Sequence, residues 1–263
     1  MLKREFKVNL KAFIIWTGIM IGILIMIYAV YPSIISGENG NKVDEMVKMF
    51  PPEVLKAFNM DIAGLDSAFG WLKSEGFVFI YLIIGIYASI LGSTLILKEE
   101  SERTVEYLVS LPVTRLKWAG DKIKAGVFYV VSMILALGIF NLAALNISEN
   151  PDNKQLLLLS ITPVFPSLVL FSVGLFLSGF MHKTKNMLGL SIGIVFAAYM
   201  LNVISEMGDS VRFLRYFSVF TLADARNVIN DSRINPWCII ISLMLFTALT
   251  VISVLRYDKK ELV

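Results

Sequence analysis

The chain has 263 residues, of which 56% are hydrophobic and only 17% are charged, whereas roughly a quarter of the residues in a soluble domain are charged. The apolar residues form charge-free blocks about twenty residues long, and one soluble core could not bury them all. A single cysteine, Cys238, and a single histidine, His182, exclude an internal disulfide framework and a cysteine- or histidine-rich metal site. We therefore expect an all-α integral membrane protein.

The first predicted span covers residues 12–31 and follows a basic N-terminus. Its apolar run is too long for a signal peptide, and Ala29-Val30-Tyr31 is a poor cleavage site, so we interpret it as a retained anchor. Five further blocks can each cross a hydrocarbon core of roughly 30 Å. They are residues 77–97, 125–145, 156–181, 187–204 and 237–255. Pro163 and Pro166 predict a kink near the start of the fourth span.

The distribution of basic residues predicts the orientation. Fifteen of the 24 Lys and Arg residues fall in the N-terminus, the segments 98–124 and 182–186, and the C-terminus. The other nine are spread over longer connecting segments, which influence orientation less. Both termini and the loop 98–124 are therefore predicted to be cytoplasmic, in a single multi-pass transmembrane domain over residues 1–263 of a cell-membrane protein.

Three segments outside the spans are predicted to be amphipathic helices. Residues 42–72 and 211–229 place apolar side chains at helical spacings among charges, which is typical of helices that lie on the outer membrane surface or pack as a lid over the bundle. Leu2, Phe6 and Leu10, at four-residue steps beside basic residues, predict an equivalent helix on the inner surface.

Small residues recur at four-residue steps in three spans, a pattern that lets helix backbones approach closely. The pattern leaves open whether the partner helix belongs to this chain or to another, and glycine is common in membrane helices in any case. Among polar span residues, Asn141 and Asn202 are interpreted as interhelical hydrogen-bond partners. The small residues concerned are Gly18, Gly22, Gly85, Ser89, Ser93, Gly189, Gly193 and Ala197.

The predicted spans contain no Asp, Glu, Lys, Arg or His, whereas ion-driven carriers usually need such groups at membrane depth. The sequence also lacks the phosphate-binding pattern GxxxxGK[ST]. We therefore predict no catalytic, cofactor-binding or metal-binding residue in this chain. Either the energy for transport comes from outside this chain, or no transport occurs.

The loop 98–124 is dense in charge but places Val105, Leu108 and Val109 at i, i+3 and i+4, which predicts a short amphipathic helix. Acidic residues at its start favour the helix dipole, and Pro112 is expected to end it. A free loop gains nothing from an apolar stripe, whereas a docking surface does. We interpret this loop as a docking element.

The same loop resembles the signature of the type-2 ABC exporter permeases. That signature has an acidic start, a threonine, two leucines, a proline, an arginine three residues later and a lysine ten residues later. Segments 50–77, 215–224 and 256–262 resemble other stretches of the family, so the resemblance covers most of the chain. Arg103 and Val219 depart from the usual glycine and proline. The matching positions are Glu99, Glu102, Thr104, Leu108, Leu111, Pro112, Arg115 and Lys122.

The resemblance implies a permease whose inner loop forms a coupling helix seated on a separate ABC ATPase. Two permeases, identical or paralogous, would assemble in the bilayer with two ATPases, which would hold ATP and Mg²⁺. The residues implied in ATPase coupling are Glu99, Glu102, Thr104, Val105, Glu106, Leu108, Val109, Pro112, Arg115 and Lys122.

The expected function is ATP-driven export of an amphipathic or hydrophobic cargo, for example a peptide antibiotic or a lipid, with no nucleic-acid partner. The apolar span surfaces suggest such a cargo, although helices facing lipid need the same surfaces. A membrane sensor or immunity component with the same fold is the alternative. A secondary transporter or channel would require intramembrane charge or an internal repeat, and the sequence shows neither.

Overall fold

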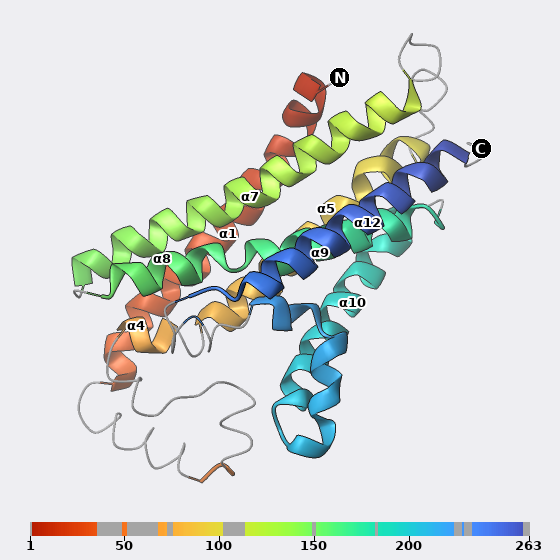
Figure 1. Ribbon diagram of the computed structural model, residues 1–263. Coiled ribbons are helices and arrows are strands. Elements are labelled where there is room, and N and C mark those ends of the chain that lie inside the picture. Colours follow the sequence, from red (N-terminus) through yellow and green to blue (C-terminus); the bar gives the residue numbers. More distant parts are fainter. Residues whose placement is uncertain are drawn as a thin grey trace.

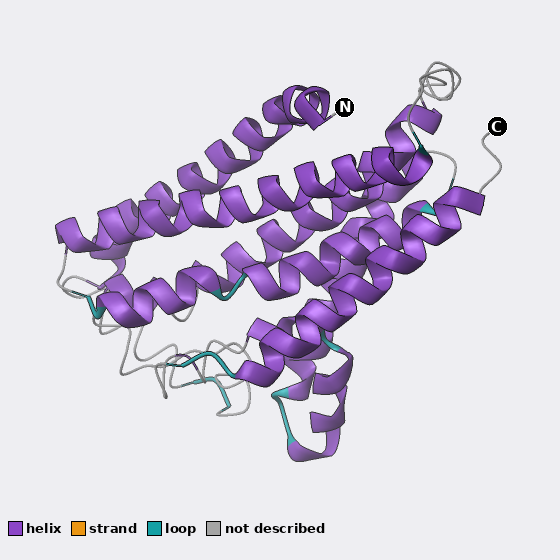
Figure 2. Cartoon of the chain, turned by 45° about the horizontal axis from the view of Figure 1, so that its top comes forward, coloured by secondary structure: helices purple, strands orange, loops and turns teal. Residues whose placement is uncertain are grey.

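The structure is a computed structural model that describes residues 2–35, 49–51, 68–72, 76–101, 114–148, 151–181, 184–223, 228 and 233–259. All regular structure within these ranges is helical, with no strand (Figure 2). Six helical segments in them are long and apolar enough to cross a membrane. The prediction of an all-helical chain with six candidate membrane spans is therefore confirmed.

Most of the long helices lie side by side in one bundle, and both chain ends lie at the same end of it (Figure 1). Several begin earlier or end later than the charge-free blocks, because charged residues can continue a helix beyond the hydrocarbon core. The spanning helices are α1 (Leu2–Ile35), α5 (Phe77–Ser101), α7 (Arg115–Ser148), α8 (Asn153–Ile161) with α9 (Val164–Ser178), α10 (Thr184–Ser205) and α12 (Pro236–Lys259).

The N-terminal residues differ from the sequence-based expectation. Leu2, Phe6 and Leu10 belong to α1 itself, which runs without a break from Leu2 to Ile35. Phe6 packs edge-on against Phe128 of α7 at a ring-centroid distance of 5.0 Å. Contact with α7 therefore takes the place of the separate inner-surface helix predicted for this stretch.

The fourth span is broken where the prolines predicted it. Helix α8 ends at Ile161 and α9 begins at Val164, because Pro163 has no backbone N–H to donate to the preceding turn. Both the N–H and the hydroxyl of Thr162 donate to the carbonyl of Leu158, at 3.0 and 2.6 Å, and so close the end of α8. The predicted kink is confirmed.

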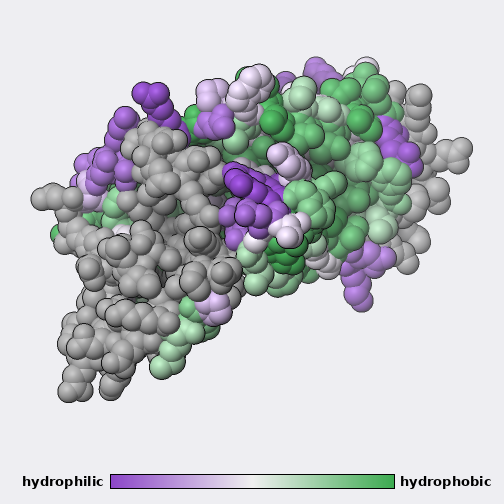
Figure 3. Space-filling view, turned by 60° about the horizontal axis from the view of Figure 1, so that its bottom comes forward, coloured by the Kyte–Doolittle hydropathy of each residue, from purple (hydrophilic) through white to green (hydrophobic). Residues whose placement is uncertain are grey.

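Helices α5 and α9 form the buried centre of the bundle. A Cβ atom added at Gly92 would overlap the backbone of Phe171, and one added at Gly174 would overlap the backbone of Ser89. Such close backbone approach is typical of membrane helix pairs with small residues at their interface. On α1, α7, α10 and α12 many large apolar side chains are exposed, and hydrophobic residues dominate much of the described surface in Figure 3.

Polar side chains also connect the spans. Tyr28 of α1 donates to the side-chain oxygen of Asn141 on α7 at 2.9 Å, which confirms the interhelical role predicted for Asn141. Ser191 of α10 donates to Ser93 of α5 at 3.3 Å in a buried contact. These bonds satisfy polar groups that would be costly to leave alone in hydrocarbon.

Of the segment 211–229, predicted as an outer amphipathic helix, the structure describes residues 211–223 and 228. Residues 211–223 belong to two short 3₁₀-helices with Ser218 between them, η3 (Asp209–Phe217) and η4 (Val219–Ala223). Ser218 separates them in an extended conformation, and its hydroxyl donates to the carbonyl of Ala198 on α10 at 2.7 Å. Of the other predicted outer segment, 42–72, the structure describes only residues 49–51 and 68–72, which include the short helix α4 (Ala68–Trp71).

Candidate functional site: a charged junction beside the predicted coupling loop

The predicted coupling loop is described at both of its ends. Helix α5 ends at Ser101 and α7 begins at Arg115, and both ends lie where the two chain termini lie (Figure 1). Arg115, Glu99 and Lys122 are therefore placed by the structure. The other predicted coupling residues lie outside the described residues: Glu102, Thr104, Val105, Glu106, Leu108, Val109 and Pro112.

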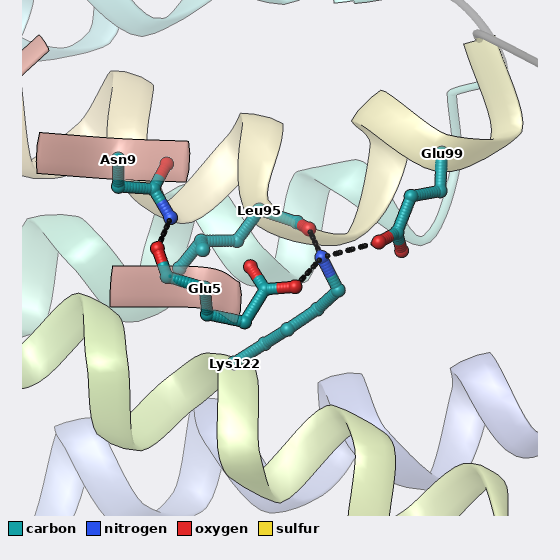
Figure 4. A network of polar contacts seen from close by, with 5 residues as sticks. All are labelled: Glu5, Asn9, Leu95, Glu99 and Lys122. Atoms are coloured by element: carbon teal, nitrogen blue, oxygen red, sulfur yellow. Dashed lines mark hydrogen bonds and ion pairs between the residues drawn. The ribbon is translucent and has the colours of Figure 1, made fainter. Parts of the chain in front are cut away.

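Lys122 lies at the centre of a buried charged cluster (Figure 4). Its Nζ is 3.1 Å from Glu5 Oε1 of α1 and 3.1 Å from Glu99 Oε1 of α5. It also donates to the carbonyl of Leu95 at 2.6 Å. We call Glu5, Glu99 and Lys122 the charged junction, because these three side chains connect three helices.

The helical repeat explains how α5 contributes two acceptors. Leu95 and Glu99 are four residues apart, so they lie one turn apart on the same face of α5. Lys122 reaches both because its long aliphatic stem can follow the apolar helix surface while its ammonium contacts the acceptors. The ammonium of α7 therefore lies between the polar end of α5 and the first turns of α1.

Each residue of the junction is nearly inaccessible to solvent, with 4% of Glu5, 5% of Glu99 and 3% of Lys122 exposed. A buried ion pair gains little stability over apolar packing, but removing one partner typically costs about 3 to 5 kcal/mol because a charge is left uncompensated. The junction therefore connects α1, α5 and α7 through charges that depend on one another, and loss of one would leave another buried without its partner.

Aromatic contacts extend the junction to α12. Trp118, one turn before Lys122, stacks on Tyr257 with ring centroids 5.2 Å apart. The Lys122 ammonium is 4.9 Å from the centre of the Trp118 ring, within the range of a cation–π interaction. On the other side, Tyr129 of α7 donates to the backbone carbonyl of Phe6.

Two further contacts connect the remaining helices at this end of the bundle. The Arg256 guanidinium of α12 lies 3.8 Å from the centre of the Phe180 ring, just after α9. The hydroxyls of Ser101 and Thr184 are 3.3 Å apart and connect the end of α5 to the start of α10. At this end of the bundle, contacts therefore connect α5 and α7, the two helices that border the 102–113 segment, to α1, α10 and α12.

Glu5 and Trp118 take part in this site although the sequence analysis did not single them out. Glu5 is an acidic residue inside an otherwise basic N-terminus, and that isolated charge is the only signal for it. The three junction residues all lie just outside the predicted charge-free spans, within the longer helices that the structure shows. Among the described residues, no group of three His, Cys, Asp or Glu side chains could hold a metal ion.

The predicted packing residues separate into two groups. A Cβ atom at Gly85 would lie 2.9 Å from the Leu170 side chain of α9, and Ser89 is fully buried. The other four glycines have nothing within 4 Å of an added Cβ atom in the described chain: Gly18, Gly22, Gly189 and Gly193. Gly92 and Gly174, at the tightest approach of α5 and α9, were not predicted.

The family model described as "ABC-2 family transporter protein" matches residues 1–262. Searches of the curated proteins and of the solved structures gave no match. The family match covers both α5 and α7, which carry the charged junction, and the segment between them.

Proposed function

This chain belongs to the ABC-2 family of transporter membrane proteins, and from that premise we propose that it is the permease subunit of an ATP-driven ABC exporter. The absence of a GxxxxGK[ST] pattern from the sequence supports a separate ATPase subunit. In this proposal two copies of that ATPase, with ATP and Mg²⁺, assemble with two permeases, and an amphipathic or hydrophobic cargo leaves the cytoplasmic side.

The proposed contact with the ATPase is the segment between α5 and α7. Val105, Leu108 and Val109 would form the apolar face of a coupling helix, seated in a groove of the ATPase. The excess of basic residues at the ends of α5, α7 and both termini supports a cytoplasmic location for this segment.

The contacts of Lys122 support the proposal independently of the family match. Lys122 of α7 contacts both Glu99 of α5 and Glu5 of α1, so the helices on either side of the segment are connected to each other and to the first span. Movement of an ATPase against the segment would then displace these three helices together. This is how a chain without its own nucleotide site could respond to ATP.

The test is to purify the tagged chain from its native membrane and to identify the proteins that co-purify. We expect an ATPase that carries the phosphate-binding loop, and ATP hydrolysis by the complex but not by the chain alone. Specific ATP turnover by the purified chain alone, or the absence of any such ATPase from the complex, would contradict the proposal.

A further inference from the structure

We propose that the groove between η3 and the start of α12 binds one anionic phospholipid of the bilayer. The groove has a volume of about 670 Å³ and lies at the opposite end of α12 from the charged junction. Its polar side carries Arg212 and Arg215, and its apolar side carries Trp237, Ile241 and Leu245. The inference depends only on the membrane location of the chain and not on the proposed export function.

The polar side follows from the geometry of η3. A 3₁₀-helix has three residues per turn, so residues three apart, such as Arg212 and Arg215, lie on the same side. Both line the groove, and among the described residues that line it there is no Asp or Glu. Asp209 is 3.9 Å from Arg212, but both side chains are largely exposed, and such a pair contributes little. Guanidinium groups suit a phosphate, because each can donate two parallel hydrogen bonds to its oxygens.

The backbone that carries these arginines is held in place. Thr221 donates to the carbonyl of Arg215 at 3.1 Å and to the carbonyl of Ser218 at 2.6 Å. Ser218 is in turn bonded to Ala198 of α10. The polar side of the groove is thus largely formed before a ligand arrives, which lowers the entropic cost of binding.

The apolar side runs along the membrane span. Trp237, Ile241 and Leu245 follow one another at four-residue steps, so they form a stripe roughly 12 Å long on one face of α12. Trp237 is 69% exposed and Tyr216 of η3 is 90% exposed, and such residues are enriched at the headgroup level of membranes. The groove therefore extends from headgroup depth into the hydrocarbon region.

This arrangement fits a phospholipid better than a free anion. A free anion would use the arginines alone, whereas a phospholipid also covers the apolar stripe with its acyl chains. Phosphatidylglycerol has a net negative charge, whereas the choline group of phosphatidylcholine would be repelled by the arginines. We therefore expect selectivity for phosphatidylglycerol of roughly tenfold, equivalent to about 1.4 kcal/mol.

The experiment compares lipid retention by the full chain in native mass spectrometry, with phosphatidylglycerol or phosphatidylcholine added. Arg212→Gln with Arg215→Gln should abolish the preference for phosphatidylglycerol. Lys154→Gln, which removes an exposed cation at the start of α8 and outside the groove, should retain it. Equal retention of both lipids by the parent chain would overturn the proposal.

Fluorescence quenching by the same lipids with brominated chains locates the site. Brominated phosphatidylglycerol should quench more than brominated phosphatidylcholine in the parent chain, and Trp237→Phe should remove that difference. Inorganic phosphate should not displace the lipid. The proposal would be overturned if the difference in quenching survives Trp237→Phe, or if phosphate displaces the lipid. It would also be overturned if a second copy of the chain covers the groove and excludes lipid.

Discussion

Lys122, near the start of α7, contacts Glu99, near the end of α5, with 3.1 Å between Nζ and Oε1. These two helices border the 102–113 segment on either side. The helices that precede and follow this segment are therefore joined to each other. Glu5, also 3.1 Å from Lys122, adds the first span to the same contact. In the proposed exporter, a force on the segment would act on three helices connected by the charged junction, and not on two independent helix ends.

The first prediction concerns removal of the central cation. Lys122→Met leaves Glu5 and Glu99 buried without their partner, so we expect the purified protein to lose roughly 3 kcal/mol or more of stability. Thermal unfolding in detergent, followed by circular dichroism, measures the loss. Lys117→Met is the matched control, because Lys117 is exposed on the same helix and should change stability little.

The same experiment separates charge from packing. Adding Glu5→Gln and Glu99→Gln to Lys122→Met removes the uncompensated charges, so a large share of the lost stability should return. If Lys122→Met unfolds like the parent, or if the triple variant is as unstable as the single one, the charged junction does not hold the three helices together.

A second prediction concerns the two groups of glycines. Gly174→Ala should destabilise the chain by about 1 to 3 kcal/mol, because the new methyl group would overlap the backbone of Ser89 and the helices must separate. Gly189→Ala should leave the isolated chain intact, since nothing lies within 4 Å of its added Cβ atom. Thermal unfolding of the two variants makes the comparison, and equal effects would contradict the α5–α9 packing.

If the open glycines contact a second permease, Gly189→Ala or Gly193→Ala should weaken self-association without changing unfolding of the single chain. Cross-linking in native membranes or light scattering of the purified protein would measure this. If neither variant changes self-association, Gly189 and Gly193 do not lie at the contact with a second permease.

The third prediction concerns orientation. In a Cys238→Ser background, Gly40→Cys and Asn230→Cys should react with a membrane-impermeant thiol reagent added outside the cell. Thr104→Cys and Thr184→Cys should react only after the membrane is opened, because the basic segments beside them are predicted to be cytoplasmic. Labelling of Thr104→Cys in intact cells would overturn both the orientation and the proposed ATPase contact.

Features that depend on local composition could be read from the sequence. Six apolar blocks identified the spans, Pro163 located the break between α8 and α9, and the isolated polar side chain of Asn141 identified an interhelical bond. The predicted spans are shorter than the helices, because hydropathy marks the boundary of the hydrocarbon core, whereas the backbone hydrogen bonds of a helix continue past it. This is why residues 2–11 were separated from α1.

Features that depend on contacts between distant residues could not be read in this way. Nothing in the sequence near Glu5 indicates that its partner is Lys122, because the pair forms only when α1 packs on α7. Gly92 and Gly174 likewise gain their role from the crossing of α5 and α9. The family resemblance selected Glu99 and Lys122 as coupling residues, and the structure adds that they contact each other.

The most direct test of the proposed ATPase contact is to substitute an apolar residue of the coupling helix. Complete burial of a residue such as Leu108 contributes roughly 1.5 to 3 kcal/mol, and a few such residues usually dominate an interface. Glu106, a rim charge in this proposal, should contribute about 1 kcal/mol or less. We would compare Leu108→Glu with Glu106→Ala, each checked for normal membrane insertion, by the amount of co-purified ATPase and by the ATP turnover of the complex. If this segment docks on the ATPase, Leu108→Glu should lose ATPase association or coupled turnover, whereas Glu106→Ala should stay close to the parent. A Leu108→Glu variant that assembles and turns over ATP like the parent would contradict the proposed contact.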